Sequence, residues 1–310
     1  MLDEAIEGLA IRPEGTYVDV TFGGGGHSRA ILSALRAEGR LLAFDQDEDA
    51  KAESEKLEDG RLTFINENFR YLKNFLRLHG VRKVDGILAD LGVSSHQFDV
   101  AERGFSTRFD GALDLRMDQR GEVTAADLVN NLDENELGRL LKLYGELPNA
   151  KQMARAIVKC RQGADAPIRT TGELKAAVQR HLPRGMENKY LAMLFQALRI
   201  EVNGELEALR AMLQQACEVL VPGGRLVVIS YHSLEDRLVK NFMKSGNFEG
   251  EMEKDFYGNV LSPMKMVSRG AVQASEAELA VNNRARSARL RVGEKVEVEH
   301  DIKAVPQSNQ

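Results

Sequence analysis

The stretch Asp19-Val-Thr-Phe-Gly-Gly-Gly-Gly-His27 decides the fold, because in it a short β-rich segment runs directly into four glycines. The residues that follow place Ile31, Leu32 and Leu35 at helical spacing. Consecutive glycines let the backbone turn tightly and approach a ligand without Cβ clashes. The stretch therefore predicts a strand, a loop and a helix, with a nucleotide-like ligand over the carboxyl end of the strand.

The spacing of the glycines favours S-adenosylmethionine over a dinucleotide as that ligand. A dinucleotide fingerprint needs a third glycine for close packing of helix and strand, and Ser28 or Arg29 stands at that place. S-adenosylmethionine carries no pyrophosphate and needs only the turn and the space. Asp45, nineteen residues beyond Gly26, ends the second predicted strand and could accept both ribose hydroxyls of either cofactor. A nicotinamide-dependent oxidoreductase is therefore the alternative class of enzyme, and a glycine turn without a ligand is the plainest alternative.

Strand and helix patterns alternate on both sides of a long interruption. Further strands are predicted at residues 40–45, 61–65, 84–90, 225–230, 264–267 and 288–292, and helices at 28–35, 51–57, 71–78, 205–220 and 233–243. The last of these helices is expected to open with a capping box of Ser233 and Asp236. This order is typical of an α/β fold with a Rossmann-like, mostly parallel, seven-stranded sheet that carries helices on both faces.

The interruption begins with a loop and continues as helices. Residues 92–122 have scattered apolar residues among many Gly, Asp, Ser and Arg, as functional loops do. Only helical patterns follow as far as residue 200, two of them opening at capping boxes at Asp133 and Thr170. We therefore expect the sheet domain in two parts, at residues 1–95 and 203–293. Between them, residues 96–202 form a loop and a helical insert for substrate recognition. The polar tail at residues 294–310 is expected to be disordered.

Polar residues follow the ends of other predicted strands, where an open α/β sheet binds its ligands. Asp90 ends the fourth strand, which should flank the topological switch together with the first, so Asp90 is expected to face the reacting centre. Tyr231 and His232 follow the fifth strand at the same edge. His232 could orient a base or accept a proton, or it could be a bystander. Phe69, just past the third strand, could flank an adenine or belong to the core.

The charge of the chain is uneven. A net charge of −5 argues against a protein that coats nucleic acid nonspecifically. Residues 151–199 nevertheless contain ten Lys and Arg against three acids, and residues 262–291 contain six against two. Two separate basic segments on an acidic body favour a polyanion that is gripped at chosen places, although each could be a solvated helix face.

Composition excludes several classes of protein. The only cysteines are Cys160 and Cys217, which argues against a disulfide scaffold or a Cys-rich zinc site. No apolar run approaches the ~20 residues that cross a bilayer. Residues 1–4 include two acids and lack the basic and apolar regions of a signal peptide. We therefore expect a cytoplasmic protein that does not contact membranes.

Seven longer runs occur together and in order along the chain. They are Thr21-Phe-Gly-Gly-Gly-Gly-His-Ser-Arg29, Asp90-Leu-Gly-Val-Ser-Ser95, Ala101-Glu-Arg-Gly-Phe-Ser106, Leu113-Asp-Leu-Arg-Met-Asp118, Phe195-Gln-Ala-Leu-Arg-Ile-Glu-Val-Asn203, His232-Ser-Leu-Glu-Asp-Arg237 and Arg284-Ala-Arg-Ser-Ala288. In these runs the chain resembles the bacterial 16S ribosomal RNA (cytosine-N4) methyltransferase family, and the resemblance spans almost the whole chain. It implies a class I S-adenosylmethionine-dependent methyltransferase domain with an inserted α-helical subdomain.

The resemblance also implies a reaction and a partner. A methyl group would pass from S-adenosylmethionine to the N4 amine of one cytidine in the decoding region of 16S rRNA, on the assembled small ribosomal subunit. Carried over by position, the cofactor contacts fall on Gly25, Gly26, His27, Asp45, Phe69, Asp90 and Gln97. No metal is expected, because the leaving group is a neutral thioether.

The chain departs from the family pattern in two places. The family usually carries a His-x-Ser/Pro-Val-Leu stretch before the position of Leu2, so we expect a shortened start. Residues 188–194 read Asn-Lys-Tyr-Leu-Ala-Met-Leu where the family commonly has His-Pro-Ala-Thr-Arg-Thr. Substrate contacts from these two regions are therefore not carried over.

The group that accepts a hydrogen bond from the amine is left open by the sequence. Many amino-methyltransferases use an Asp/Asn-Pro-Pro-aromatic run after the fourth strand, but this chain has Asp90-Leu-Gly-Val93. Either Asp90 or nearby backbone carbonyls must serve. Arg103, Arg108 and Arg116, together with the basic insert, are expected to grip RNA phosphates. A DNA or protein methyltransferase and a non-catalytic ribosome-assembly factor are the alternative functions.

Overall fold

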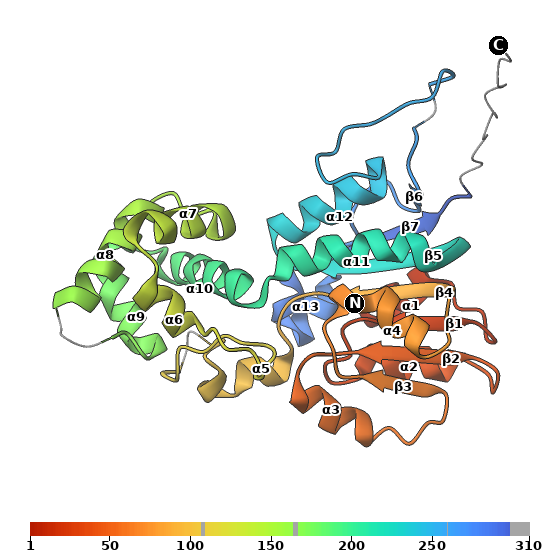
Figure 1. The fold of residues 1–310 in the computed structure, drawn as a ribbon, viewed down its shortest axis with the longest axis horizontal. Coiled ribbons are helices and arrows are strands. Elements are labelled where there is room, and N and C mark those ends of the chain that lie inside the picture. Colours follow the sequence, from red (N-terminus) through yellow and green to blue (C-terminus); the bar gives the residue numbers. More distant parts are fainter. Residues whose placement is uncertain (107–108, 164–166, 259, 298–310) are drawn as a thin grey trace, which may run out of the picture.

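A seven-stranded sheet forms the centre of the larger of two packed bodies (Figure 1). The computed structural model describes residues 1–106, 109–163, 167–258 and 260–297. The strands are β1 (Thr16–Asp19), β2 (Arg40–Phe44), β3 (Leu62–Ile65), β4 (Val84–Asp90), β5 (Leu220–Ser230), β6 (Met264–Met266) and β7 (Arg289–Lys295). Their order is β3-β2-β1-β4-β5-β7-β6, and β7 runs antiparallel to both of its neighbours. The expected mostly parallel sheet, with β1 beside β4, is confirmed.

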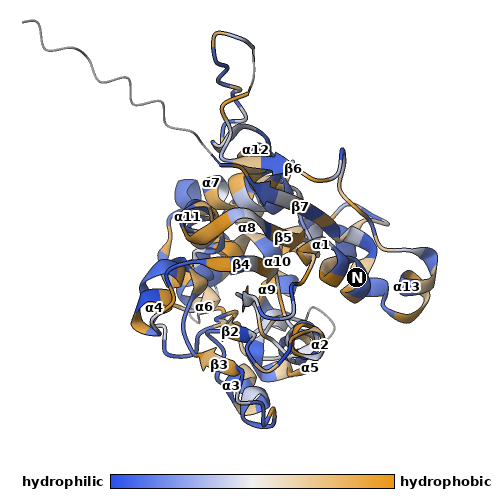
Figure 2. Cartoon of the chain, turned by 90° about the vertical axis from the view of Figure 1, so that its right-hand side faces the viewer, coloured by the Kyte–Doolittle hydropathy of each residue, from blue (hydrophilic) through white to orange (hydrophobic). Residues whose placement is uncertain are grey.

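Helices cover both faces of this sheet because its strands are apolar on both sides. In β4, for example, Ile87 and Ala89 pack on one face and Leu88 packs on the other. One face is covered by α4 (Leu72–Leu78), α11 (Glu205–Val219) and α12 (Ser233–Ser245). The other face is covered by α1 (Leu2–Leu9) and α2 (Gly26–Ala34). Helix α3 (Glu48–Glu55) lies beside β2, and α13 (Glu276–Val281) lies near α1. Apolar residues gather where helices face the sheet (Figure 2).

The second body is helical and has a core of its own. It contains α6 (Ala125–Asn131), α7 (Glu134–Gly145), α8 (Ala150–Gly163), α9 (Thr171–Val178) and α10 (Glu187–Asn203), and the short α5 (Ser95–Asp99) lies at its base. Its buried apolar residues form a cluster separate from those of the sheet. Helix α10 leads from this body to α11 through Gly204, whose φ of 55° ends the helix (Figure 1).

Several elements differ from their expected bounds. Helices α1, α5 and α13 were not expected, and β5 begins at Leu220 rather than at residue 225. The capping boxes at Asp133 and Thr170 are confirmed. The one expected at Ser233 is wrong, because His232 and Glu235 cap α12 one residue earlier. Strand β7 takes the first two residues of the expected tail, and residues 298–310 lie outside the described part of the chain.

A buried ion pair ties the loop after β4 to the end of β2. The carboxylate of Asp47 binds both terminal nitrogens of Arg103, at 2.9 and 3.2 Å, and each side chain is 6% exposed. The same guanidinium donates to the backbone carbonyls of Arg116 and Met117. Arg103 is therefore not available to an external phosphate, and our expectation for it is wrong. Arg116 is also engaged, by Asp114 at 2.7 Å, and Arg108 lies outside the described residues.

Replacing Arg103 by methionine should destabilise the protein, because it leaves the Asp47 carboxylate buried without its counter-charge. We expect the free energy of unfolding to fall by about 3–5 kcal/mol. The matched control is Arg155→Met, since Arg155 is 77% exposed and pairs with Glu134 at the surface. The control should change stability by ~1 kcal/mol or less. Urea unfolding followed by circular dichroism measures both, and equal losses in the two variants would contradict the buried role of Arg103.

Candidate active site

A cavity of about 580 Å³ opens at the carboxyl edge of the sheet, where β1 and β4 lie side by side. Its walls come from the glycine loop after β1, the end of β2, the start of α3, the residues after β3 and β4, and the start of α11. Strand order reverses direction at this point of the sheet, and open α/β sheets bind ligands at such a switch. The volume is usual for a small-molecule site.

The cavity brings together most of the residues expected from the sequence. Six of them line it: Gly26, His27, Asp45, Phe69, Asp90 and Gln97. Gly25 is the exception. Its φ is 74°, and a Cβ at this position would lie 2.8 Å from the ring of Phe22, so Gly25 permits the turn rather than lining the cavity. Gly23 and Gly24 line the cavity instead.

The glycine loop presents open backbone and an unpaired nitrogen to the cavity. A Cβ added at Gly24 or Gly26 would meet nothing within 4 Å, so both positions leave room for a ligand. The Nε2 atom of His27 is buried and has no hydrogen-bond partner in the described part of the chain. Buried polar atoms are almost always paired in a complete structure. The loop therefore fits a polar ligand such as the amino-acid part of S-adenosylmethionine.

Asp45 occupies the place expected of a ribose-binding carboxylate. Its Oδ2 accepts the N–H of Gly23 at 2.8 Å, and its Oδ1 accepts the N–H of Asp47 at 3.0 Å. Burial raises the pKa of Asp45 to about 6, against the lowering effect of these two hydrogen bonds. Each oxygen keeps a lone pair for a ribose hydroxyl. Asp45 can thus hold both the glycine loop and a nucleoside.

Phe69 and Gln97 contribute to the wall in different ways. Phe69 is half-buried, lies at the first position of a short 3₁₀ helix, and also packs against the sheet core. Gln97 is 5% exposed, and its amide is already used by the protein. Its nitrogen donates to Asp47 at 2.5 Å, and its oxygen accepts the N–H of Ser94 at 3.0 Å. Gln97 therefore holds the wall in place.

Asp90 is the hub of the site. Its Oδ1 accepts the hydroxyl of Tyr231 at 2.8 Å, and its Oδ2 lies 3.6 Å from Nδ1 of His27. Its backbone N–H donates to the hydroxyl of Thr21 at 2.6 Å. Burial raises the pKa of the Asp90 carboxyl, while His27 and the Tyr231 hydroxyl act to lower it. Burial and the adjacent carboxylate raise the pKa of the Tyr231 phenol, which therefore stays protonated.

His232 does not line the cavity. Its Nδ1 accepts the backbone N–H of Glu235 at 3.4 Å, and its Nε2 lies 3.2 Å from the Glu235 carboxylate. The His232 side chain therefore caps the N-terminus of α12. Of the two catalytic candidates, Asp90 alone faces the cavity.

Glu205, His232 and Glu235 come within 4.8 Å of one another, as metal ligands would. The guanidinium of Arg199, however, binds both carboxylate oxygens of Glu205 at 2.8 and 2.9 Å. His232 and Arg199 also lower the pKa of Glu235. The group therefore forms a network of ion pairs and hydrogen bonds that joins α10, α11 and the start of α12. That no metal takes part stays a prediction.

The strand order and the acidic residues around the glycine loop define a class I methyltransferase with a Rossmann-like sheet. The sequence matches the MraW methylase family over residues 1–296, and the chain belongs to that family. S-adenosylmethionine is its cofactor. His27, Asp45 and the open glycines are the residues that would hold it.

Curated relatives carry a consistent name. A protein named ribosomal RNA small subunit methyltransferase H from Flavobacterium johnsoniae is 56% identical over 96% of this chain and 96% of its own. One of the same name from Bacteroides thetaiotaomicron is 57% identical over 95% and 96%. Among solved structures, an rRNA methylase from Streptococcus thermophilus is similar at 13% identity with a TM-score of 0.42. The match covers 96% of this chain and 94% of that one.

Membrane insertion is not indicated by the described residues: none of their helices combines the length and the apolar character of a bilayer-spanning segment.

The raised pKa of Asp45 makes a testable link between pH and cofactor affinity. Ribose hydroxyls donate to a carboxylate, so protonation of Asp45 below about pH 6 should weaken S-adenosylmethionine binding. We expect Kd to rise roughly tenfold between pH 7 and pH 5. Calorimetric titration from pH 5 to pH 8 measures this. The Asp45→Asn variant should bind more weakly at every pH and lose this dependence, and a flat profile in the unmodified protein would contradict the role.

Proposed function

We propose that this methyltransferase modifies small-subunit ribosomal RNA at the N4 amine of one cytidine in the decoding region. The observation that carries the proposal is the Asp90 carboxylate, which faces the cavity at the reacting edge of the sheet and is held by Tyr231 and His27. The names of the curated relatives and the resemblance in seven runs of sequence support the choice of RNA.

The chemistry of the amine explains why a carboxylate is needed at this point. The N4 lone pair is delocalised into the cytosine ring, so the amine is a poor nucleophile. A carboxylate that accepts an N4–H hydrogen bond restores lone-pair character, and it can take the proton that the amine loses when its N–C bond forms. When bound, S-adenosylmethionine supplies the methyl group and retains the S–C electron pair as a neutral thioether. Asp90 accepts the N4–H hydrogen bond and takes the proton, and Tyr231 and His27 fix its orientation.

Tyr231 also supplies an aromatic wall that the run after β4 lacks. Gly92 has a φ of 98°, and a Cβ there would lie 3.4 Å from the ring of Tyr231. The ring therefore lies against the backbone just beyond Asp90, although it comes from the end of β5. A flipped base entering the cavity would meet this ring and the Asp90 carboxylate together.

The helical body offers the surface for RNA. Within residues 151–199, the exposed cations are Lys151, Arg155, Lys159, Arg169, Arg180, Arg184 and Lys189. Two further arginines of this segment serve the fold instead, since Arg161 donates to backbone carbonyls and Arg199 binds Glu205. Exposed Lys and Arg give salt-dependent affinity for phosphates without reading sequence. We assign substrate recognition on the assembled subunit to residues 96–202.

Product identification tests the proposal directly. The protein is incubated with methyl-labelled S-adenosylmethionine and, separately, small subunits, naked rRNA, DNA and a protein mixture. The labelled product is then digested to nucleosides. We expect label in N4-methylcytidine, with small subunits the best substrate. Label in DNA or protein, or no transfer to any substrate, would overturn the assignment.

Two variants separate the roles of Asp90 and Tyr231. Asp90→Ala should lower kcat by a factor of about 100 or more, because both the hydrogen bond and the proton acceptor are lost, and it should change cofactor affinity far less. Single-turnover transfer and calorimetry measure the two quantities. Full transfer by Asp90→Ala would remove that residue from the mechanism.

Tyr231→Phe keeps the aromatic wall and removes one hydrogen bond to Asp90. Because that bond lowers the pKa of Asp90, its loss should raise the pKa, and the acid limb of the kcat–pH profile should move to higher pH. An unchanged profile in this variant would show that the hydroxyl does not act through Asp90.

A further inference from the structure

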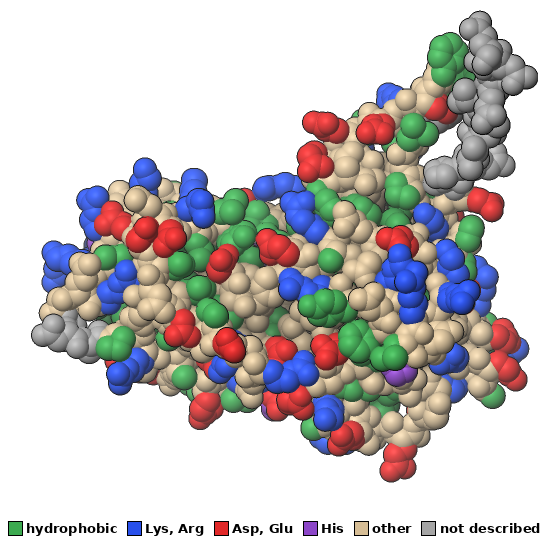
Figure 3. Space-filling view, viewed as in Figure 1, with side chains coloured by type: hydrophobic (Ala, Val, Ile, Leu, Met, Phe, Trp, Pro, Cys, Tyr) green, Lys and Arg blue, Asp and Glu red, His purple; other side chains and the backbone are tan. Residues whose placement is uncertain are grey.

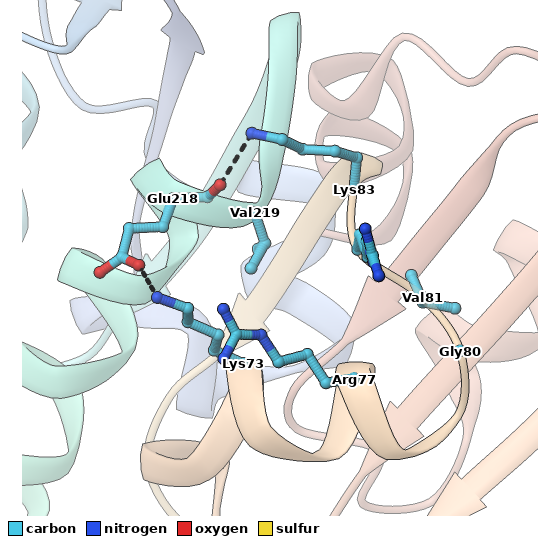
Figure 4. A pocket seen from close by; sticks show the side chains of 8 residues that line it. Lys73, Arg77, Gly80, Val81, Lys83, Glu218 and Val219 are labelled. Carbon is cyan, nitrogen blue, oxygen red and sulfur yellow. Dashed lines mark hydrogen bonds and ion pairs between the residues drawn. The ribbon is translucent and has the colours of Figure 1, made fainter.

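A second cavity, of about 650 Å³, opens at the opposite edge of the sheet from the active site. It is lined by the end of α4, the residues that lead into β4, and the end of α11 (Figure 4). Val84 and Leu220, the first residues of β4 and β5, pair in register directly beside it. Strand β4 spans seven residues, so this basic groove lies ~20 Å from the carboxylate of Asp90.

The basic groove carries four cations and one acid: Lys73, Arg77, Arg82 and Lys83 against Glu218. Lys73 forms an ion pair with the carboxylate of Glu218, and Lys83 donates to its backbone carbonyl at 2.9 Å (Figure 4). Figure 3 shows Lys and Arg side chains gathered over the part of the surface where α4 and the end of α11 lie. Glu218 thus binds two of the four cations, Lys73 through its carboxylate and Lys83 through its backbone carbonyl.

The two arginines have no such partner. Arg77 and Arg82 are exposed, and neither side chain forms a hydrogen bond or ion pair with any residue that the structure describes. Val81 and Val219 add apolar surface beside them. A guanidinium presents its donors as a planar fork that matches the oxygens of a phosphate. Two unpaired guanidinium groups in one groove are suited to a ligand with more than one phosphate.

The charge of the whole chain makes this concentration significant. A protein with a net charge of −5 repels a polyanion at long range, so local basic surfaces decide where the polyanion can lie. The helical body lies to one side of the sheet, whereas α4 and the end of α11, which line the groove, lie against the sheet itself (Figure 1). Contact at both places would hold an RNA substrate against the active site from two directions.

We propose that the basic groove binds phosphates of the RNA backbone at a point ~20 Å from the target base. The inference rests on the proposed function, since it takes the ligand to be the same RNA substrate. Free polyphosphate compounds share the chemistry, and the experiment separates the two sources.

The test reverses the two unpaired charges by Arg77→Glu with Arg82→Glu. The control, Arg36→Glu with Arg40→Glu, makes the same change of charge at exposed positions on the same edge of the sheet, outside the groove. Binding to small subunits is measured at stepped salt concentrations, together with kcat, KM and the Kd for S-adenosylmethionine. A neutral pair, Arg77→Gln with Arg82→Gln, repeats the measurement with a milder change.

We expect the Arg77/Arg82 reversal to weaken subunit binding at least tenfold and to reduce the slope of log K against log salt by about 1.5, the effect of two lost phosphate contacts. The neutral pair should shift both quantities in the same direction. The KM for small subunits should rise by about the same factor as their Kd. The kcat at saturation and the Kd for S-adenosylmethionine should stay unchanged, because the active site is untouched. The control should leave all of them near the values of the unmodified protein.

Three outcomes would overturn the proposal. An unchanged Kd and salt slope in both groove variants would show that no phosphate binds there. An equal loss in the control would show only general electrostatics. Saturable binding of inorganic pyrophosphate that needs Arg77 and Arg82, without any change in subunit binding, would assign the groove to a free phosphate compound. Failure of the proposed function is distinguishable, since it appears as missing N4-methylcytidine with the unmodified protein.

Discussion

The pairing of Asp47 with Arg103 is the interaction on which the arrangement of this protein depends. Asp47 is the N-cap of α3, two residues beyond Asp45, and Arg103 lies in the loop that leads to the helical body. Burial of the Arg103 guanidinium costs free energy unless its charge is paired. The loop is therefore stabilised in the position that brings Arg103 to Asp47. Gln97 binds the same carboxylate. The cofactor wall and the base of the helical body are therefore held by one side chain.

The same interaction links the wall of the cavity to the helical body. The Arg103 guanidinium also holds the carbonyls of Arg116 and Met117, and the backbone N–H of Met117 donates to Asn203 at the end of α10. Met117 and Asn203 both line the cavity. The insert thus contributes to the cavity wall directly.

At Asp90, on the wall of the cavity, burial and hydrogen bonding act on the pKa of the carboxyl in opposite directions. Desolvation favours the neutral acid, whereas the Tyr231 hydroxyl and the nearby His27 favour the carboxylate. A group poised in this way can accept a proton and release it again, as a general base must. At Asp45 burial likewise raises the pKa, to about 6, while two backbone N–H groups that donate to its oxygens act to lower it.

The sequence alone determined the sheet, the cofactor loop, and the positions of Asp45 and Asp90. Each of these follows from local pattern: alternation of strands and helices, glycines where a turn is tight, and an acid directly after an apolar strand. Bounds were less well predicted, as at β5, because Leu220 already pairs with Val84 of β4 and the register of the two strands shifts before Arg225.

Only the tertiary structure decided which polar side chains are desolvated and what they touch. Tyr231 reaches Asp90 across 141 residues of sequence, and Arg103 meets Asp47 across 56. Arginines that look alike in the sequence lie either in a buried ion pair or in an exposed groove, and the side chain of His232 caps α12. A catalytic role of His232 stays a prediction. The physical reason is that burial depends on how distant segments pack, and packing sets both the partner and the pKa of each ionisable group.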